Sequence, residues 1–233
     1  DSVSPRMDFT IYLDGADLGA LGITQQTIKT GFTLEGWYEG NASQYEVEAD
    51  IIDGVAVYNN KTYLLGSFES HAFVTEDTTA VNIKNRILNL DLQSNASPIA
   101  FTQAINRHFK RYVTENYQED SIINPVNLKL NAKISEAPIL NKVFIPNLEE
   151  LDTVNIDVDF REKDRELDAF VDLPSVKYMG SQIDSLKLEM FSDNTDLNFD
   201  FGFKALTAGP LAIKRTQLDG GVVNRKLQLE FSS

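Results

Sequence analysis

Alternation of apolar and polar residues at every second position is the feature that most constrains this chain. It is clearest in the middle of the sequence, where segments 154–160 and 167–173 are followed about thirty residues later by segments 184–190 and 197–203. A strand with this alternation has one apolar and one polar face, and a repeat at such a period is typical of stacked, elongated β architectures. The sequence therefore predicts a mainly β protein whose apolar strand faces carry its function.

Composition narrows the functional classes. The formal net charge is -14, from 35 acidic and 21 basic side chains, which argues against nucleic-acid binding because phosphates are neutralised by Lys and Arg. It also argues against docking flat on an anionic membrane leaflet. The absence of cysteine excludes disulfides and thiol catalysis. The sequence has neither an apolar run long enough to span a bilayer nor a charged-then-apolar leader, and we expect it to be a piece of a longer protein.

One segment breaks the β pattern and predicts the only long helix. Ser97 and Pro98 are favourable at the N-cap and first helical positions, and the helix is expected over 98–117. Its polar side is basic, which would let it touch a membrane surface, a partner protein or neighbouring carboxylates. The interpretation we favour is that its apolar side covers an open part of the sheet. The residues of that side are Phe101, Ile105, Phe109 and Tyr112.

The remaining pattern predicts β segments over 1–97 and 118–233, on either side of the helix, in one continuous fold. Asn59 and Asn60 separate two apolar runs and favour a tight two-residue turn with positive φ. Gly220 and Gly221 are expected to form a turn near the end of the chain.

Catalytic chemistry has few candidates, and the chain is predicted not to be an enzyme and to need no cofactor or metal. His71 and His108 have no metal-ligand or nucleophile-relay spacing, and His108 is expected as a surface or boundary residue of the helix. Asp157 and Asp159 share the polar face of one strand, and 162–166 is expected to be a solvated turn. A glycan-binding or hydrolytic β fold that uses these acidic residues is a minor alternative.

The apolar strand faces allow two architectures. If two sheets close on each other, these faces form a dry sandwich core and serve stability alone. If one long sheet curls without closing, they line an open trough that apolar chains could fill. Periodicity does not distinguish the two.

Three stretches give the chain a resemblance to a known family. They are 33–41 (TLEGWYEGN), 87–112, which leads from an alternating segment into the helix, and the long alternating tract 126–231. Together they resemble the C-terminal region of TamB-type proteins of the AsmA-like superfamily, in the form found in Bacteroidetes-like bacteria.

The resemblance implies a fold and a function. Such proteins build an elongated, curled antiparallel β-sheet, the β-taco, whose hydrophobic groove is associated with phospholipid transport between inner and outer membranes. They are anchored in the inner membrane, cross the periplasm and meet a TamA- or BamA-like barrel of the outer membrane. By this resemblance the chain would be an internal segment of such a bridge, since it lacks the anchor.

A lipid conduit needs a continuous apolar path, because exposing an acyl chain to water costs about 0.8 kcal/mol per methylene. The residues expected to line the groove are Leu128, Leu130, Val154, Ile156, Val158, Leu186, Leu188, Leu197, Phe199, Phe201, Leu227 and Leu229. The alternative is a scaffold that assists outer-membrane β-barrel assembly by pairing its strand edges with client strands.

Overall fold

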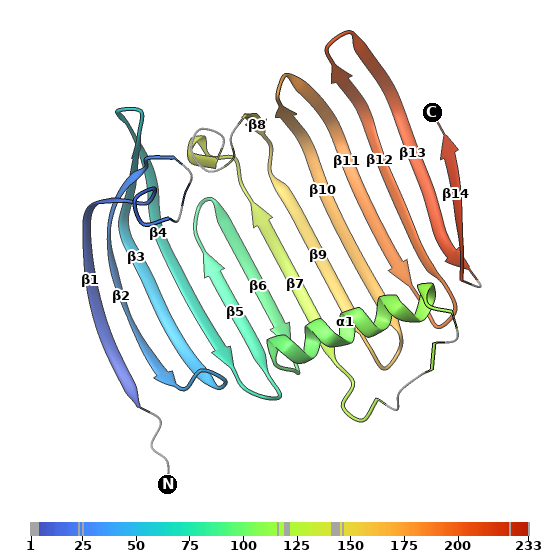
Figure 1. Ribbon diagram of the computed structural model, residues 1–233, viewed down its shortest axis with the longest axis horizontal. Coiled ribbons are helices and arrows are strands. Elements are labelled where there is room, and N and C mark those ends of the chain that lie inside the picture. The colour runs from blue at the N-terminus through green and yellow to red at the C-terminus, as the bar shows by residue number, and fades with distance from the viewer. Residues whose placement is uncertain are drawn as a thin grey trace.

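The protein is one open antiparallel sheet crossed at its strand ends by a single long helix (Figure 1). The computed structural model describes residues 5–22, 24, 26–115, 117–118, 122–140, 145, 147–223 and 225–232. The prediction of a mainly β chain, built as an elongated, curled antiparallel sheet with one amphipathic helix, is confirmed. Over these residues there is one sheet and not two, so the alternative of a closed sandwich is excluded.

The elements follow the alternation of the sequence. The strands are β1 (Arg6–Asp17), β2 (Lys29–Gly40), β3 (Tyr45–Tyr58), β4 (Lys61–Val74), β5 (Thr79–Lys84), β6 (Leu88–Ser94), β7 (Asn127–Ile134), β8 (Leu148–Leu151), β9 (Val154–Arg161), β10 (Glu166–Tyr178), β11 (Ser181–Ser192), β12 (Leu197–Ala208), β13 (Leu211–Val223) and β14 (Lys226–Ser232). The helix α1 spans Pro98–Val113.

Strand order along the sheet is the order of the sequence, from β1 to β14, except that β8 lies off this path and pairs with β10. The helix is inserted between β6 and β7, yet these two strands pair directly with each other. The β segments before and after the helix therefore belong to one continuous sheet. The strands β1 and β14 form its two edges.

The helix is shorter than the sequence predicts. Ser97 caps it by accepting a hydrogen bond from the Ala100 N–H at 3.3 Å, with Pro98 in the first turn. It ends at Val113, because Thr114 adopts an extended conformation and its N–H donates to Lys110 O. Of the predicted helical end, residue 116 lies outside the described residues.

Tight turns join the long strands. Asn59 and Asn60 both have positive φ, 48° and 58°, as predicted for the turn between β3 and β4. Met179 and Gly180 form the corresponding turn between β10 and β11, with φ of 50° and 74°. Positive φ at both central residues matches the right-handed twist of the flanking strands, which fixes the register of each hairpin.

The predicted turn at Gly220 and Gly221 is wrong. Both glycines lie inside β13, where they pair with β12 and β14. In the sequence, two adjacent glycines predict a turn because glycine is conformationally free. In the sheet, the missing side chain of Gly220 instead leaves room for the ring of Phe199.

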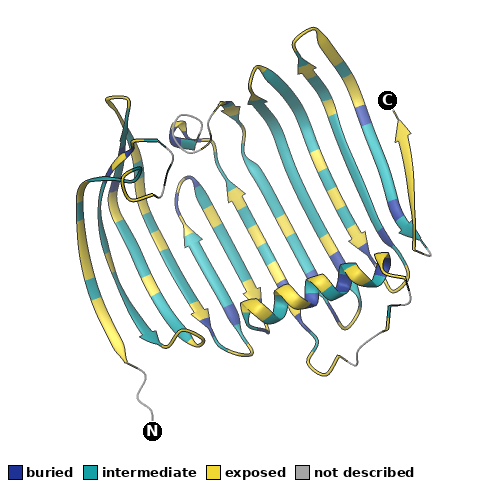
Figure 2. Cartoon of the chain, viewed as in Figure 1, coloured by how far each residue is buried: buried dark blue, intermediate teal, exposed yellow. Residues whose placement is uncertain are grey.

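Fully buried residues are few and gather in two places, while most strand residues are only partly covered (Figure 2). One cluster lies at the ends of the N-terminal strands that are distant from α1. It consists of Ile28, Ala56, Ile87, Ala137 and Ile139. The other lies under the helix and consists of Ala96, Ala104, Val126, Leu128, Phe160 and Leu167. A sheet with no second layer across most of its area leaves its side chains partly exposed.

Candidate functional site

Strand register assembles the alternating residues into one apolar face. Following the paired positions from β1 to β14 gives a row that crosses thirteen strands without a charged side chain. Twelve steps of about 4.8 Å make this row about 58 Å long. Its members are Met7, Tyr38, Val47, Ala72, Val81, Leu92, Leu130, Val158, Ala169, Met190, Phe199, Gly220 and Leu229. We call the side of the sheet that carries this row the apolar face.

All twelve residues predicted to line a groove lie on the apolar face, because their pairings and two-residue spacings keep them in phase with this row. Their exposure differs with position. Leu128 and Leu197 are buried near the helix, the residues of the central strands are half-buried, and Leu227 and Leu229 on the edge strand β14 are 61% and 57% exposed. The edge residues are open because no further strand packs beside them.

The apolar face has a limited width along the strands. β9 contributes four alternating apolar residues, from Val154 to Phe160, and β10 contributes four from Leu167 to Leu173. Four such positions span about 20 Å. Beyond Leu173 the next position in phase is Ser175, whose hydroxyl donates to Asp184 at 3.3 Å. The apolar strip is therefore bounded on this side by polar residues.

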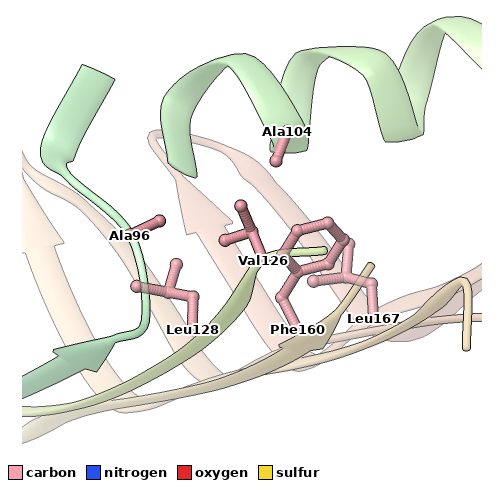
Figure 3. Close-up of a cluster of buried hydrophobic side chains, with 6 residues drawn as sticks. All are labelled: Ala96, Ala104, Val126, Leu128, Phe160 and Leu167. Atoms are coloured by element: carbon pink, nitrogen blue, oxygen red, sulfur yellow. The ribbon is translucent and has the colours of Figure 1, made fainter. Parts of the chain in front are cut away.

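The opposite boundary is formed by α1, which packs on the apolar face near the strand ends. Figure 3 shows Ala104 on the helix facing Val126 and Phe160 below it. Phe101, Ile105 and Phe109 are partly buried against the same cluster. From the strands, Leu92, Val158, Ala169 and Met190 pack against the same cluster.

A buried carboxylate fixes the middle of the helix to the sheet. Glu162 is 4% exposed, and its Oε1 accepts from Arg107 Nη2 at 2.8 Å and Nε at 3.1 Å. Its Oε2 accepts from the Val126 N–H at 3.0 Å. The expectation that 162–166 is wholly solvated is therefore wrong at Glu162, because α1 folds back over the β9–β10 turn.

His108 is the second attachment of the helix, and its predicted surface or boundary position is also wrong. It is 4% exposed, and its Nε2 lies 2.9 Å from the hydroxyl of Ser192. Its ring packs edge-on against Phe160, with centroids 5.2 Å apart. Burial, and secondarily the nearby Arg111 cation, lower the pKa of His108 from 6.5 to about 4. The imidazole is therefore neutral at pH 7.

The helix end is held by Tyr112, whose hydroxyl donates to Asp193 O at 2.6 Å. Tyr112 is 3% exposed. The apolar side of α1 thus covers the strand ends as a fixed rim, and Arg107, His108 and Tyr112 bind residues at strand termini.

In the thirteen-strand row, the ring of Phe199 fills the space left by the missing side chain of Gly220. The ring of Phe199 lies over Gly220, and a methyl group built on that glycine would come within 2.2 Å of the ring. Phe199 and Gly220 are directly paired between β12 and β13. The ring therefore continues the apolar surface where β13 has no side chain.

The other side of the sheet carries a second row of paired positions, and this row is rich in acidic residues. Eight of its thirteen positions are Asp or Glu and none is Lys or Arg. The row is Asp8, Trp37, Glu48, His71, Asn82, Asp91, Asn131, Asp157, Phe170, Glu189, Asp200, Asp219 and Glu230. Burial and the adjacent Asp219 raise the pKa of Asp200. The two faces of the sheet thus differ in character, one apolar and the other polar and acidic.

Some residues of the apolar face lie in the alternating segments of the sequence but were not among the predicted groove-lining residues. Met190, Val171 and Phe203 follow the same alternation, so extending the two-residue spacing along each strand adds them to the lining. Glu162 and Ser192 gave no such signal, because their partners are distant in sequence.

The site offers little for catalysis. Within the described ranges, no group of three or more His, Asp or Glu residues is placed to hold a metal ion. His71 lies 2.8 Å from Glu46 on the polar face, as a partly exposed pair.

The fold and site define a class: an open antiparallel sheet with one continuous apolar face and a helix along one margin. Among the helices of the described chain, none is both long and apolar enough to cross a membrane. No known family, curated protein or solved structure matches the chain.

Proposed function

We propose that the apolar face binds the acyl chains of phospholipids and that the chain is a segment of a bridge along which these lipids pass. The observation that carries the proposal is the row of thirteen paired positions without a charge, from Met7 to Leu229. A strip about 58 Å long and about 20 Å wide has an area of about 1,200 Å², of which α1 covers one margin. The largest exposed apolar patch of a typical monomer is about 300–600 Å².

The dimensions of the strip support a lipid as the ligand. The hydrocarbon core of a bilayer is about 30 Å thick, so one leaflet contributes about 15 Å of acyl chain. Between α1 and the polar residues Ser175 and Asp184 the strip is narrower than its full width, because Phe160 and Leu167 are buried under the helix. Its uncovered part on β9, from Val154 to Val158, spans about 13 Å, which is close to that length. Each buried methylene contributes about 0.8 kcal/mol, which favours acyl chains over small apolar ligands.

The uniformity of the strip supports movement along it. Neighbouring strands present Val158, Ala169 and Met190 in turn at the same level, so a ligand meets similar chemistry at each step of about 4.8 Å. Similar affinity at each step leaves no deep trap. The resemblance to TamB-type proteins extends the proposal to phospholipid passage in the periplasm, between an inner-membrane anchor outside this sequence and an outer-membrane barrel of the TamA or BamA type.

The test places charges on the strip. Ile156 and Leu188 are half-buried on neighbouring parts of the apolar face. Ile156→Asp with Leu188→Asp should abolish the transfer of a fluorescent phospholipid between vesicles by the purified chain. Asn155→Asp with Asn198→Asp adds the same charge on the polar face and should leave transfer unchanged. Equal transfer by both double variants, with circular dichroism showing intact sheet, contradicts the proposal.

A second function is favoured by the edge strand β14. Leu227, Leu229 and Phe231 are 61%, 57% and 67% exposed, and among the described strands β14 pairs with β13 alone. Such an edge can pair with a client strand, as a scaffold for β-barrel assembly requires. Crosslinks from Gln228 to an outer-membrane client, with none to lipid from Ile156, would favour this function over lipid passage.

A further inference from the structure

A hollow interrupts the polar face over β11, β12 and β13, and its volume is about 450 Å³. At its centre is Gly202, whose missing side chain leaves the space, and its φ is not in the left-handed region. The side chains around it come from all three strands and include Ser185, Lys187, Lys204, Arg215 and Gln217.

Register explains how the basic residues converge. Gly202 pairs with Lys187 on one side and with Gln217 on the other. Lys204 and Arg215 lie opposite each other, between the paired positions Phe203–Thr216 and Ala205–Lys214. Lys204 lies two residues after Gly202, and Arg215 lies two residues before Gln217. Residues two apart on a strand point to the same side of the sheet, so both basic side chains lie on the side of Gly202. Three cations from three strands thus surround one empty position.

The end of the hollow formed by Lys204 and Arg215 is electrostatically unfavourable without a ligand. Like charges directly opposite on neighbouring strands destabilise a sheet, and Lys204 and Arg215 are such a pair. In the part of the chain that the structure describes, none of Lys187, Lys204 and Arg215 forms an ion pair within 4.0 Å. That is unexpected in a chain of net charge -14, where carboxylates outnumber basic residues.

We propose that this hollow is a binding site for a phosphate group, held by Lys187, Lys204 and Arg215. An Arg guanidinium can bind phosphate with two parallel hydrogen bonds, and the Lys ammonium groups act as point charges beside it. The volume of the hollow lies in the range of about 300–1,000 Å³ that is usual for small-molecule sites. The site lies on the polar face and is independent of acyl-chain binding on the apolar face.

The carboxylates at the margin limit what the phosphate can be attached to. Glu189 and Asp200 line the hollow next to Gly202 on the side away from Lys204. They repel a ligand with several negative groups. The site therefore takes a single phosphate whose remaining part is neutral or cationic, either as a small soluble ester or as a lipid headgroup.

The experiment has two arms, both with the whole chain. Inorganic phosphate is titrated in low-salt chloride buffer by isothermal calorimetry, which reports the soluble form. Phosphatidylcholine vesicles with and without phosphatidic acid are tested by co-sedimentation, which reports the lipid form. The variant is Lys204→Gln with Arg215→Gln, and the control is Lys133→Gln, which removes an exposed lysine of β7.

Binding of inorganic phosphate that is weakened at least tenfold in the double variant and unchanged in the control supports a soluble phosphate site. Binding of phosphatidic-acid vesicles alone, with the same dependence, supports a lipid headgroup site. Absence of binding in both arms, or binding that the double variant retains, overturns the proposal.

A second variant tests whether the shape of the hollow matters for binding, because it leaves the charges unchanged. Gly202→Ala fills the centre of the hollow, and its new methyl group would meet no atom closer than Thr216 O at 3.3 Å. It should weaken phosphate binding while all three cations stay in place. Unchanged binding in this variant also counts against the proposal, and neither variant should alter acyl-chain transfer.

Discussion

Arg107 on the helix donates two hydrogen bonds, from Nη2 and Nε, to one oxygen of the buried Glu162, 55 residues further along the chain. Truncating the arginine leaves a carboxylate that is 4% exposed with only the Val126 N–H as a partner. Breaking a buried pair costs about 3–5 kcal/mol, and the partly exposed arginine side chain reduces this.

We therefore expect Arg107→Ala to lower the free energy of unfolding by about 1–3 kcal/mol. Urea denaturation followed by circular dichroism measures it. Lys110→Ala removes an exposed cation from the same helix and should change stability by less than about 0.5 kcal/mol. Equal effects of the two substitutions would show that the buried pair does not hold the helix.

Stability should fall in mild acid because of His108. Its pKa is about 4 in the folded chain and near 6.5 when unfolded. Between these values the unfolded state binds a proton that the folded state does not, so stability is full above pH 6.5. It declines as the pH falls to about 4, by at most about 1.4 kcal/mol per pH unit.

The comparison for this prediction is His108→Gln, which removes the titrating group and keeps a polar side chain near Ser192. From pH 7 to pH 5 the native chain should lose about 1–2 kcal/mol more than the variant. Parallel losses in the two proteins would mean that His108 titrates normally.

Phe199 and Gly220 should behave as a coupled pair. Gly220→Ala forces a methyl group into the ring of Phe199 and should destabilise the chain by about 1–3 kcal/mol. Phe199→Ala alone should cost a similar amount, because a large half-buried side chain is lost. In the double variant the two effects should not add, and a double-mutant cycle measures the coupling. Additive effects would place the ring away from the glycine in solution.

Removing the apolar side of the helix should enlarge the accessible apolar face. Phe101 and Phe109 pack against the buried cluster that contains Val126 and Phe160. Replacing both phenylalanines with Ser should increase the fluorescence of a bound apolar dye severalfold. Replacing Thr102 and Asn106, which point away from the sheet, should leave the fluorescence unchanged. A matched increase in both double variants would indicate general unfolding.

Fold class was accessible from the sequence because alternation is a local signal. The spacing from Val154 to Phe160 alone predicts a strand with one apolar face, and the register of an antiparallel sheet then aligns such faces across neighbours. The start of the helix at Ser97 and Pro98 was likewise local.

What could not be predicted depends on contacts between distant segments. Glu162 and His108 have ordinary polar neighbours in sequence, and their burial follows from α1 folding over the strand ends. Gly220 gives the same sequence signal in a turn and beneath a ring, so tertiary packing alone decides which occurs. Periodicity alone did not determine that the sheet is open, since a strand with one apolar face fits a closed sandwich equally well; the family resemblance was what implied the open sheet.

The thirteen-strand path starts and finishes on strands that point the same way, since neighbours alternate and the number is odd. If one hairpin is added or removed within the path, the first and last strands stay parallel to each other. All the remaining strands keep their directions. Each added or removed hairpin would change the length of the sheet, measured across its strands, by about 9.6 Å. The apolar and polar faces would keep their positions. Gene duplication of a two-strand unit such as 181–208 would thus lengthen the sheet without exchanging its faces.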